Sequence, residues 1–512
     1  MDNSQNNVGY LPQMPIFDGK ICTEINSDFS LPDYKCEMRR LLATHVTVLA
    51  PNEYIGNSDA ALDGEVVYKI IYLGADSQVY SATLSDKYSF TVPLEYNSHS
   101  ASTNDVSLIH ICSSDTVNTR VLGPRKLNIR AKLSCRALAL SPALYTPANV
   151  DTQKNDSEVE LRLIQKQSST VKRCVSEPIH LSDLITTDTN TENIRVIDSI
   201  STVHVEECLP STDHINIKGT VTIKTYYCDE SETHRVQVST RKLPFSHSIY
   251  CEGASSASEC NAYGIADTEQ PTVAESSISI ELTLTLCATC QAITPVSLVD
   301  DAYSTEYHSQ STYASLMLPK ALKCSCGTLT HNDAFSLDDI KLPQDSKIID
   351  VLPRAYVEAI SNENGRLVIK GKTEYQIIYF NDQEYLSKEV SAPFKYETDC
   401  KFDSTDDSAL KWHVEPTAIH SRARNDSDKL HIDTELNFSM LMRTYESVSY
   451  LSDLELSEPY EGSHGEIILC YPDKDDTIWS IAKQYGKKTK KLCEKNALKD
   501  EADISKKRFL VI

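Results

Sequence analysis

Three stretches of the chain share a run of β-branched and aromatic residues that starts at a glycine and ends at a tyrosine eight residues later. These stretches are Gly64–Tyr72, Gly219–Tyr227 and Gly371–Tyr379. Such a run favours a pleated, half-buried strand, and a glycine at its start suits a bend or a close backbone contact. The glycines are 155 and then 152 residues apart. A period this long predicts three copies of a whole domain.

Each of these runs is followed by a stretch in which apolar and polar residues alternate strictly. The alternating stretches are Leu127–Leu133, Ile278–Leu284 and Leu430–Leu436, and a phenylalanine precedes each of them, at Phe90, Phe245 and Phe394. A period of two gives a strand one apolar and one polar face, as in an antiparallel sheet with one face on a core. We therefore predict a mainly β fold with three homologous, antiparallel, sandwich-like domains.

The breaks between these repeats set the predicted domain boundaries. We expect a flexible, proline-containing leader at residues 1–20, repeats at 21–140, 159–292 and 319–447, an acidic linker at 448–465 and a separate tail at 466–512. Residues 293–318 are expected to be a linker or a domain edge. A chain of 512 residues has room for about three or four domains.

The tail has the periodicity of a helix. Ile478, Ile481, Ala482 and Tyr485 fall at i, i+3, i+4 and i+7, which places them on one apolar face. The preceding Asp475, Asp476 and Thr477 are suited to cap the helix. A second short helix is expected near residues 490–494, ending near Asn496. With apolar segments at 467–470 and 509–512, the predicted order is strand, helix, helix, strand.

The net charge of −23 argues against nucleic-acid binding, since phosphate contacts need clustered lysine and arginine, and against docking on anionic lipid. The tail differs, because residues 466–512 hold 11 basic and 8 acidic residues, or +3. Four of its lysines form a cluster: Lys487, Lys488, Lys490 and Lys491. This cluster is either a docking surface for an acidic protein or a solvated helix face.

The polar N-terminus lacks the basic start and apolar core of a secretory signal, and no apolar run approaches the ~18 residues of a membrane span. We expect the chain to stay where it is made, in a reducing cytosol, with its 16 cysteines mainly as buried thiols.

The sequence contains only weak candidates for catalytic or metal-binding residues. No phosphate-binding loop, nucleophile elbow or His-Glu-x-x-His motif is present, so we expect no enzyme activity and no cofactor. Cys287 and Cys290, with Cys324 and Cys326, have zinc-like spacing, but Cys287 and Cys290 continue an alternating strand, so we interpret them as strand cysteines and predict no metal site. His413 and His420 lie near Trp412 in the sequence. We interpret this proximity as a coincidence expected among 14 histidines and not as a catalytic set.

The tail resembles a LysM module, whose pattern is a Gly-Asp-Thr-Leu-Trp-x-Ile-Ala turn and helix, a later Asn and a closing Leu-x-Ile. Its matching residues are Asp476, Thr477, Trp479, Ile481, Ala482, Tyr485, Asn496, Leu510 and Ile512. The three upstream repeats resemble the SPOCS domain of endospore-coat proteins. Three such repeats followed by a LysM module is the layout of SipL-like spore-coat morphogenetic proteins.

This resemblance implies a structural adaptor of the mother-cell cytoplasm, at the forespore surface and spore coat, whose LysM module docks on the coat morphogenetic ATPase. The candidate partner-binding residues are Asp475, Asp476, Thr477, Ile478, Trp479, Ile481, Lys487, Lys488, Lys490, Lys491 and Asn496. Trp479 is expected either in the core of the module or as an interface hot spot.

The alternative is a protein that binds peptidoglycan or another N-acetylglucosamine glycan. Asp475 and Lys507 stand where glycan-binding LysM modules have glycine, and Pro472 replaces the usual valine. A side chain on the turn at Asp475 narrows the sugar groove, and this disfavours glycan binding.

Overall fold

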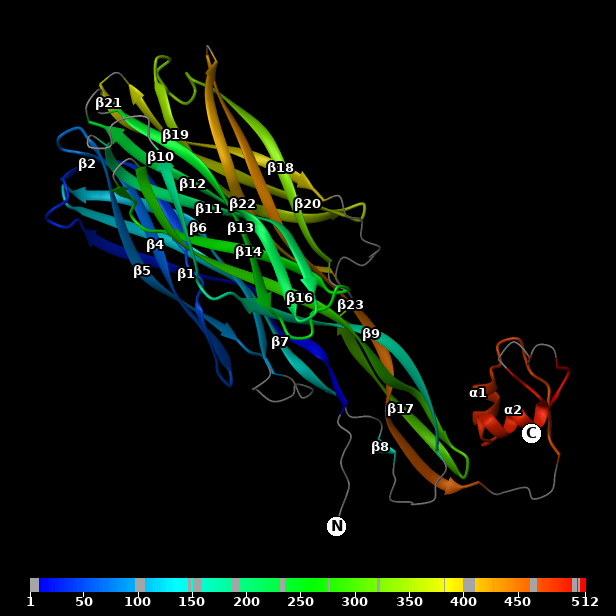
Figure 1. Cartoon of the computed structure of the whole chain (residues 1–512). Coiled ribbons are helices and arrows are strands. Elements are labelled where there is room, and N and C mark those ends of the chain that lie inside the picture. The colour runs from blue at the N-terminus through cyan, green and yellow to red at the C-terminus, as the bar shows by residue number, and fades with distance from the viewer. Residues whose placement is uncertain are drawn as a thin grey trace.

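The structure is a computed structural model that describes the chain except for residues 1–8, 97–105, 146–148, 151–158, 187–193, 231–234, 275–276, 320–322, 382, 399–409, 427, 461–466, 500–503 and 505–506. Strands account for most of it, so the predicted mainly β class is confirmed. Figure 1 shows long strands lying side by side in an elongated body, with two short helices next to one end. Neither helix of the described chain is long enough to cross a membrane.

Two antiparallel sheets, which we call the first sheet pair, enclose one apolar core at the start of the chain. One sheet has the order β2-β4-β3 with β5 also on β4, and the other has the order β1-β7-β6. Their bounds are β1 Gly9–Ser30, β2 Met38–Val48, β3 Asn52–Ile55, β4 Asp59–Gly74, β5 Val79–Pro93, β6 Ser107–Gly123 and β7 Lys126–Tyr145. Leu62 and Tyr68 of β4 meet Leu127 and Ile129 of β7 in the core.

The second sheet pair repeats this arrangement. Its sheets have the orders β11-β12-β13 and β10-β16-β14, with β9 and β15 also on β16. The bounds are β9 Val159–Val175, β10 Ile179–Thr186, β11 Ile194–Ser211, β12 His214–Asp229, β13 Val236–Tyr250, β14 Glu259–Thr268, β15 Thr272–Ala274 and β16 Ser277–Ser304. Ile217 and Ile223 of β12 pack with Ile280 and Leu284 of β16.

The third sheet pair has one sheet of order β19-β20-β21 and another in which β17, β18 and β22 all pair with β23. A short strand, β8 (Asn149–Val150), pairs with β23 in parallel. The remaining bounds are β17 Tyr307–Pro319, β18 Lys323–Ser336, β19 Lys347–Glu363, β20 Arg366–Asn381, β21 Glu384–Glu397, β22 Leu410–Asp426 and β23 Lys429–Pro459.

The glycine-to-tyrosine runs lie in β4, β12 and β20, each flanked on both sides in its sheet. Gly219 lies opposite Phe245, and an added Cβ would lie 2.7 Å from the Phe245 ring. Gly371 stands in the same relation to Phe394. In the first sheet pair the ring over Gly64 belongs to Tyr88, whereas the predicted Phe90 pairs with Leu62. The glycine is therefore required because a neighbouring aromatic ring covers it.

The structure differs from the expected leader and linkers. The leader is strand from Gly9, because β1 pairs with β7 as an edge strand and Pro15 stands at a register shift, where a missing N–H is tolerated. The expected linker at 293–318 is the end of β16 and most of β17, and residues 448–459 continue β23. Pairing partners far away in the sequence override the local composition in all three places.

These strand extensions form a structure that we call the arm, made of the far ends of β9, β16, β17 and β23. Leu298 of β16, Leu316 and Leu318 of β17 and Val448 of β23 form its core. Figure 1 shows the arm projecting from the body toward the C-terminal helices. The arm therefore provides a platform beside the tail.

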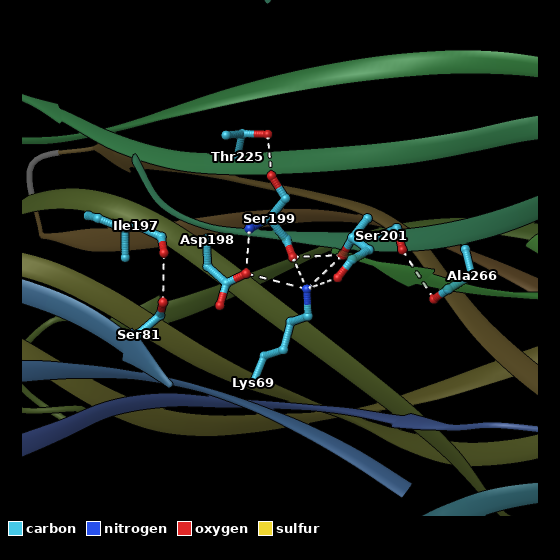
Figure 2. Close-up of polar contacts among 9 residues, drawn as sticks. Lys69, Ser81, Ile197, Asp198, Ser199, Ser201, Thr225 and Ala266 are labelled. Carbon is cyan, nitrogen blue, oxygen red and sulfur yellow. Dashed lines mark hydrogen bonds and ion pairs between the residues drawn. The ribbon is translucent and has the colours of Figure 1, made fainter. Parts of the chain in front are cut away.

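The three sheet pairs contact one another in a closed ring, because β5 contacts β11, β13 contacts β19 and β21 contacts β2. Lys69 of β4 makes the main polar contacts at the first junction, which lies between the first and second sheet pairs (Figure 2). Its ammonium group lies 3.3 Å from the Asp198 carboxylate and donates hydrogen bonds to the Ser199 carbonyl oxygen and to Thr268. Lys69 and Asp198 are both buried, so each charge depends on the other.

The second junction repeats the first with other residues. The ammonium group of Lys224, five residues after Gly219, lies 2.7 Å from the Asp350 carboxylate and donates to the Val351 carbonyl oxygen. A cavity of about 690 Å³ lies where the sheet pairs meet and is lined by β2, β6, β11, β14, β19 and β22, among other elements. His45 is one of its lining residues.

Candidate functional site

The predicted site residues lie in a small unit at the C-terminal end, which we call the tail. Its elements are β24 Leu469–Cys470, α1 Ile478–Gln484, α2 Thr489–Asn496 and β25 Leu510–Val511, and β24 pairs with β25. Its apolar core contains Ile478, Ile481, Ala482, Leu492 and Leu510. The first predicted helix begins at Ile478, and the assignment of the tail as a LysM module stays a prediction.

The residues before α1 shape the turn and the cap. The Thr477 hydroxyl accepts from the Ser480 N–H at 3.0 Å and the Ser480 hydroxyl accepts from the Thr477 N–H at 2.9 Å, which is a capping box. The Asp476 carboxylate accepts from the Asp473 N–H at 2.8 Å. Asp475 is exposed beside them. Asp476 and Thr477 therefore hold the turn, and Asp475 faces solvent.

Three of the predicted partner-binding residues are buried inside the tail. Ile478 and Ile481 are core residues of α1. The Asn496 amide donates to the carbonyl oxygens of Leu492 and Val511 and accepts from the Val511 N–H, so it joins α2 to β25. Buried side chains do not reach a partner directly, and these three act by holding the fold.

The lysine cluster surrounds the beginning of α2. Lys487, Lys490 and Lys491 are exposed, and Lys488 is the N-cap residue without a side-chain cap. The first turn of α2 contains no acidic residue. Because the N-terminal end of a helix carries a partial positive charge, lysines are unfavourable there. Folding of the helix therefore does not explain the cluster.

Trp479 contacts the arm of its own chain. Its indole N–H donates to the Asp301 carboxylate at 2.8 Å, and its ring meets the edge of Tyr303 with centroids 4.9 Å apart. The guanidinium of Arg162 lies 5.3 Å from the ring centroid. Trp479 is thus neither fully buried nor open to solvent, and it forms the centre of a contact between the tail and the arm.

Asp301 receives three hydrogen bonds at this contact. The ammonium group of Lys483 lies 2.7 Å from it, and the hydroxyl of Tyr313 donates at 2.9 Å, in addition to Trp479. Burial opposes the charged form, but these hydrogen bonds lower the pKa of Asp301 below its usual value. Asp301 therefore stays ionised and holds the tail by charge-assisted hydrogen bonds.

Two further hydrogen bonds extend this contact to the start of α2. The buried Tyr303 donates its hydroxyl to the Lys487 carbonyl oxygen at 2.8 Å. The Thr489 hydroxyl donates to the Glu160 carboxylate of β9 at 2.7 Å. Both helices of the tail are thus held by the arm.

The face of the tail at β24 and β25 carries an apolar patch that the sequence analysis missed. We define the tail patch as Ile467, Leu469, Tyr471 and Phe509, which are 77, 45, 64 and 43 % exposed. On β24, Leu469 is exposed while Cys470 enters the core, and the rings of Tyr471 and Phe509, which stand next to the two strands, have centroids 6.3 Å apart. One feature of the sequence does indicate this patch. The opening strand is apolar at consecutive positions, whereas a strand with only one buried face needs an apolar residue at every second position.

Only some of the metal and catalytic candidates that the sequence analysis set aside lie within the described residues. Cys287 and Cys290 are both buried on β16, and only Cys290 belongs to the core of the second sheet pair. The side chains of Cys324, Cys326, Trp412 and His413 lie outside the described residues. His420 lies on β22, where burial lowers its pKa. Within the described residues, His110, Cys112 and Cys135 form a compact group that sequence reasoning did not find.

Comparison with known proteins identifies one segment. A family model described as "SipL, SPOCS domain" matches residues 194–268, which run from the start of β11 to the end of β14 in the second sheet pair. No curated protein and no solved structure matches the chain. The matched segment supports a relation to SipL-like proteins and indicates a spore-associated protein.

Proposed function

We propose that this chain is a non-enzymatic structural adaptor of endospore coat assembly, which works without a cofactor at the forespore surface in the mother-cell cytoplasm. The observation that carries the proposal is the tail patch, together with the SPOCS match in the second sheet pair. Exposed apolar side chains that gather on one face mark contact sites for other proteins. The partner that fits is the coat morphogenetic ATPase.

The architecture supports reuse of one domain. Each of the three sheet pairs has one sheet with the repeated strand at its centre. At two of the three junctions, a lysine at the equivalent position of that strand makes the contact. We infer that all three are SPOCS-like domains and that the tail is a LysM module. Three domains closed into a ring would act as a rigid body that presents the tail from the arm.

Electrostatics supports a protein partner with an acidic surface. Lys487, Lys490 and Lys491 are exposed at the start of α2, where they do not help the helix. Exposed basic side chains on the same small unit as an apolar patch would steer an acidic partner to the tail. The tail patch would then supply most of the affinity.

A second candidate function is binding of peptidoglycan or another N-acetylglucosamine glycan through the same face. Tyr471 and Phe509 favour it, because their rings lie 6.3 Å apart, both are exposed, and aromatic faces stack on sugars. The exposed Asp475 side chain on the turn before α1 disfavours it.

The test compares both ligands with the full chain. The purified coat morphogenetic ATPase is immobilised in one assay, and insoluble peptidoglycan is sedimented in the other. We expect saturable binding to the ATPase and none to peptidoglycan. Retention by peptidoglycan without ATPase binding would establish the second candidate and overturn the adaptor proposal.

A further inference from the structure

The compact group of His110, Cys112 and Cys135 lies on two paired strands of the first sheet pair. Cys112 of β6 is directly opposite Cys135 of β7, and His110 is two residues before Cys112 on the same strand face. One ring nitrogen of His110 and the two sulfur atoms lie within 4.8 Å of one another. His110 and Cys135 are buried, and Cys112 is half-buried. These are three side chains of the types that bind soft metal ions, gathered in a largely buried site.

The imidazole of His110 is held in place by its surroundings. Its Nε2 lies 3.0 Å from the Glu53 carboxylate, and Arg173 of β9 contacts the same carboxylate oxygen. The hydroxyl of Tyr263 donates to the His110 carbonyl oxygen at 3.2 Å. The other ring nitrogen, Nδ1, is buried and has no hydrogen-bond partner among the described residues. A buried, unsatisfied nitrogen is costly unless it binds something.

We propose that His110, Cys112 and Cys135 bind one zinc ion, through Nδ1 of His110 and the two thiolates, with water as the fourth ligand. Two thiolates and an imidazole in a tetrahedral arrangement are typical of zinc. Binding releases the two thiol protons to solvent, so the neutral pair of thiols becomes two thiolates that balance the charge of Zn²⁺. The carboxylate of Glu53 acts as the outer partner that orients a zinc-bound histidine.

The location gives this site a structural role. Glu53 and His110 belong to the first sheet pair, while Arg173 and Tyr263 belong to the second. A metal ion that fixes the His110 ring would therefore also fix the contact between the two sheet pairs. Because the ion binds the folded chain, it would raise the temperature of unfolding.

The same two thiols, directly opposite each other, would alternatively form a disulfide. Purification under reducing, chelator-free conditions followed by elemental analysis separates the two. We expect about one zinc per full-length chain, and its loss in Cys112→Ser, Cys135→Ser and His110→Ala. The matched control is Cys208→Ser. The sulfur atoms of Cys208 and Cys260 lie 3.3 Å apart, but they are not part of a compact metal-ligand group in the described chain.

A second measurement does not depend on how well the variants fold. Addition of Co²⁺ to the metal-free wild-type chain should give a thiolate-to-cobalt charge-transfer band that one equivalent of Zn²⁺ removes. Zinc should also raise the unfolding temperature of the wild type and of Cys208→Ser. Absence of both zinc and the cobalt band, or equal zinc loss in Cys208→Ser, would overturn the proposal. A disulfide between Cys112 and Cys135 in the reduced preparation would also overturn the proposal. It would be detected as a peptide mass two hydrogens lower than that of the two free thiols.

Discussion

The side chain of Gln376 accepts a hydrogen bond from the backbone N–H of Thr44 at 3.2 Å, at the junction between the third and first sheet pairs. Gln376 follows Gly371 by five residues, as Lys69 follows Gly64 at a junction that holds a buried ion pair. By register, Ala43 stands where that junction has Asp198. The junction between the third and first sheet pairs therefore lacks both the acid and the base. This is expected if a single buried charge without a partner costs too much folding free energy.

Lys69→Met should destabilise the chain by about 3–5 kcal/mol, because the buried Asp198 carboxyl group loses its ion-pair partner. The measurement is the midpoint of urea unfolding. The control is Lys372→Met, which breaks an exposed pair with Glu358 and should leave the midpoint unchanged. Equal midpoints for the two variants would show that the buried pair does not hold the junction.

Gly219→Ala should cost about 1–3 kcal/mol, because the new methyl group would overlap the Phe245 ring and the His204 carbonyl oxygen. Urea unfolding again measures the loss. Gly123→Ala is the matched control, since nothing lies within 4 Å of a Cβ added there. A loss at Gly123 as large as at Gly219 would contradict the steric account.

Asp301→Asn should loosen the tail from the arm, because Lys483 and Trp479 lose a charged acceptor worth about 1.5–3 kcal/mol per hydrogen bond. The chain has two tryptophans, so a Trp412→Phe background leaves Trp479 as the reporter. We expect red-shifted emission and easier quenching by acrylamide. Lys491→Ala, an exposed change on α2, should leave the spectrum as it was; an unchanged spectrum in Asp301→Asn would argue against docking.

His45 should make stability depend on pH. Burial, with Lys69 and Lys224 nearby, lowers the pKa of His45 from 6.5 to about 4. The unfolded chain therefore takes up the proton first as pH falls, so the contribution of neutral His45 is present above about pH 6.5 and lost toward pH 4. The loss is on the order of 3 kcal/mol. His45→Gln should flatten this part of the stability curve, and an unaltered slope would refute the assignment.

The sequence predicted the elements whose pattern is local. The runs that begin at Gly64, Gly219 and Gly371 are strands in the middle of their sheets, and the alternating stretches line the cores. Both predicted helices exist, with Thr477 as the first cap. Period and capping chemistry are sufficient for such assignments because they depend on neighbouring residues only.

What the sequence did not predict depends on partners distant in the chain. From Gly9 onward the leader pairs with residues of β7 that are 116 to 136 positions away, and the described parts of the supposed linkers are paired strands of the arm. Trp479 meets Asp301, 178 positions earlier, and Cys112 meets Cys135 only through strand register. Sequence spacing does not specify such contacts, so the arm, the docking of the tail and the grouping of His110, Cys112 and Cys135 could not be predicted from it.

Binding of a protein partner by the tail patch is tested most directly by the dissociation constant of the full chain for the purified coat morphogenetic ATPase. Double substitution of Tyr471→Ser and Phe509→Ser should weaken binding at least about tenfold. Tyr34→Ser, which alters a tyrosine that is 83 % exposed on the first sheet pair, should bind like the wild type. An unchanged dissociation constant in the double variant, or no binding by the wild type, would contradict the account.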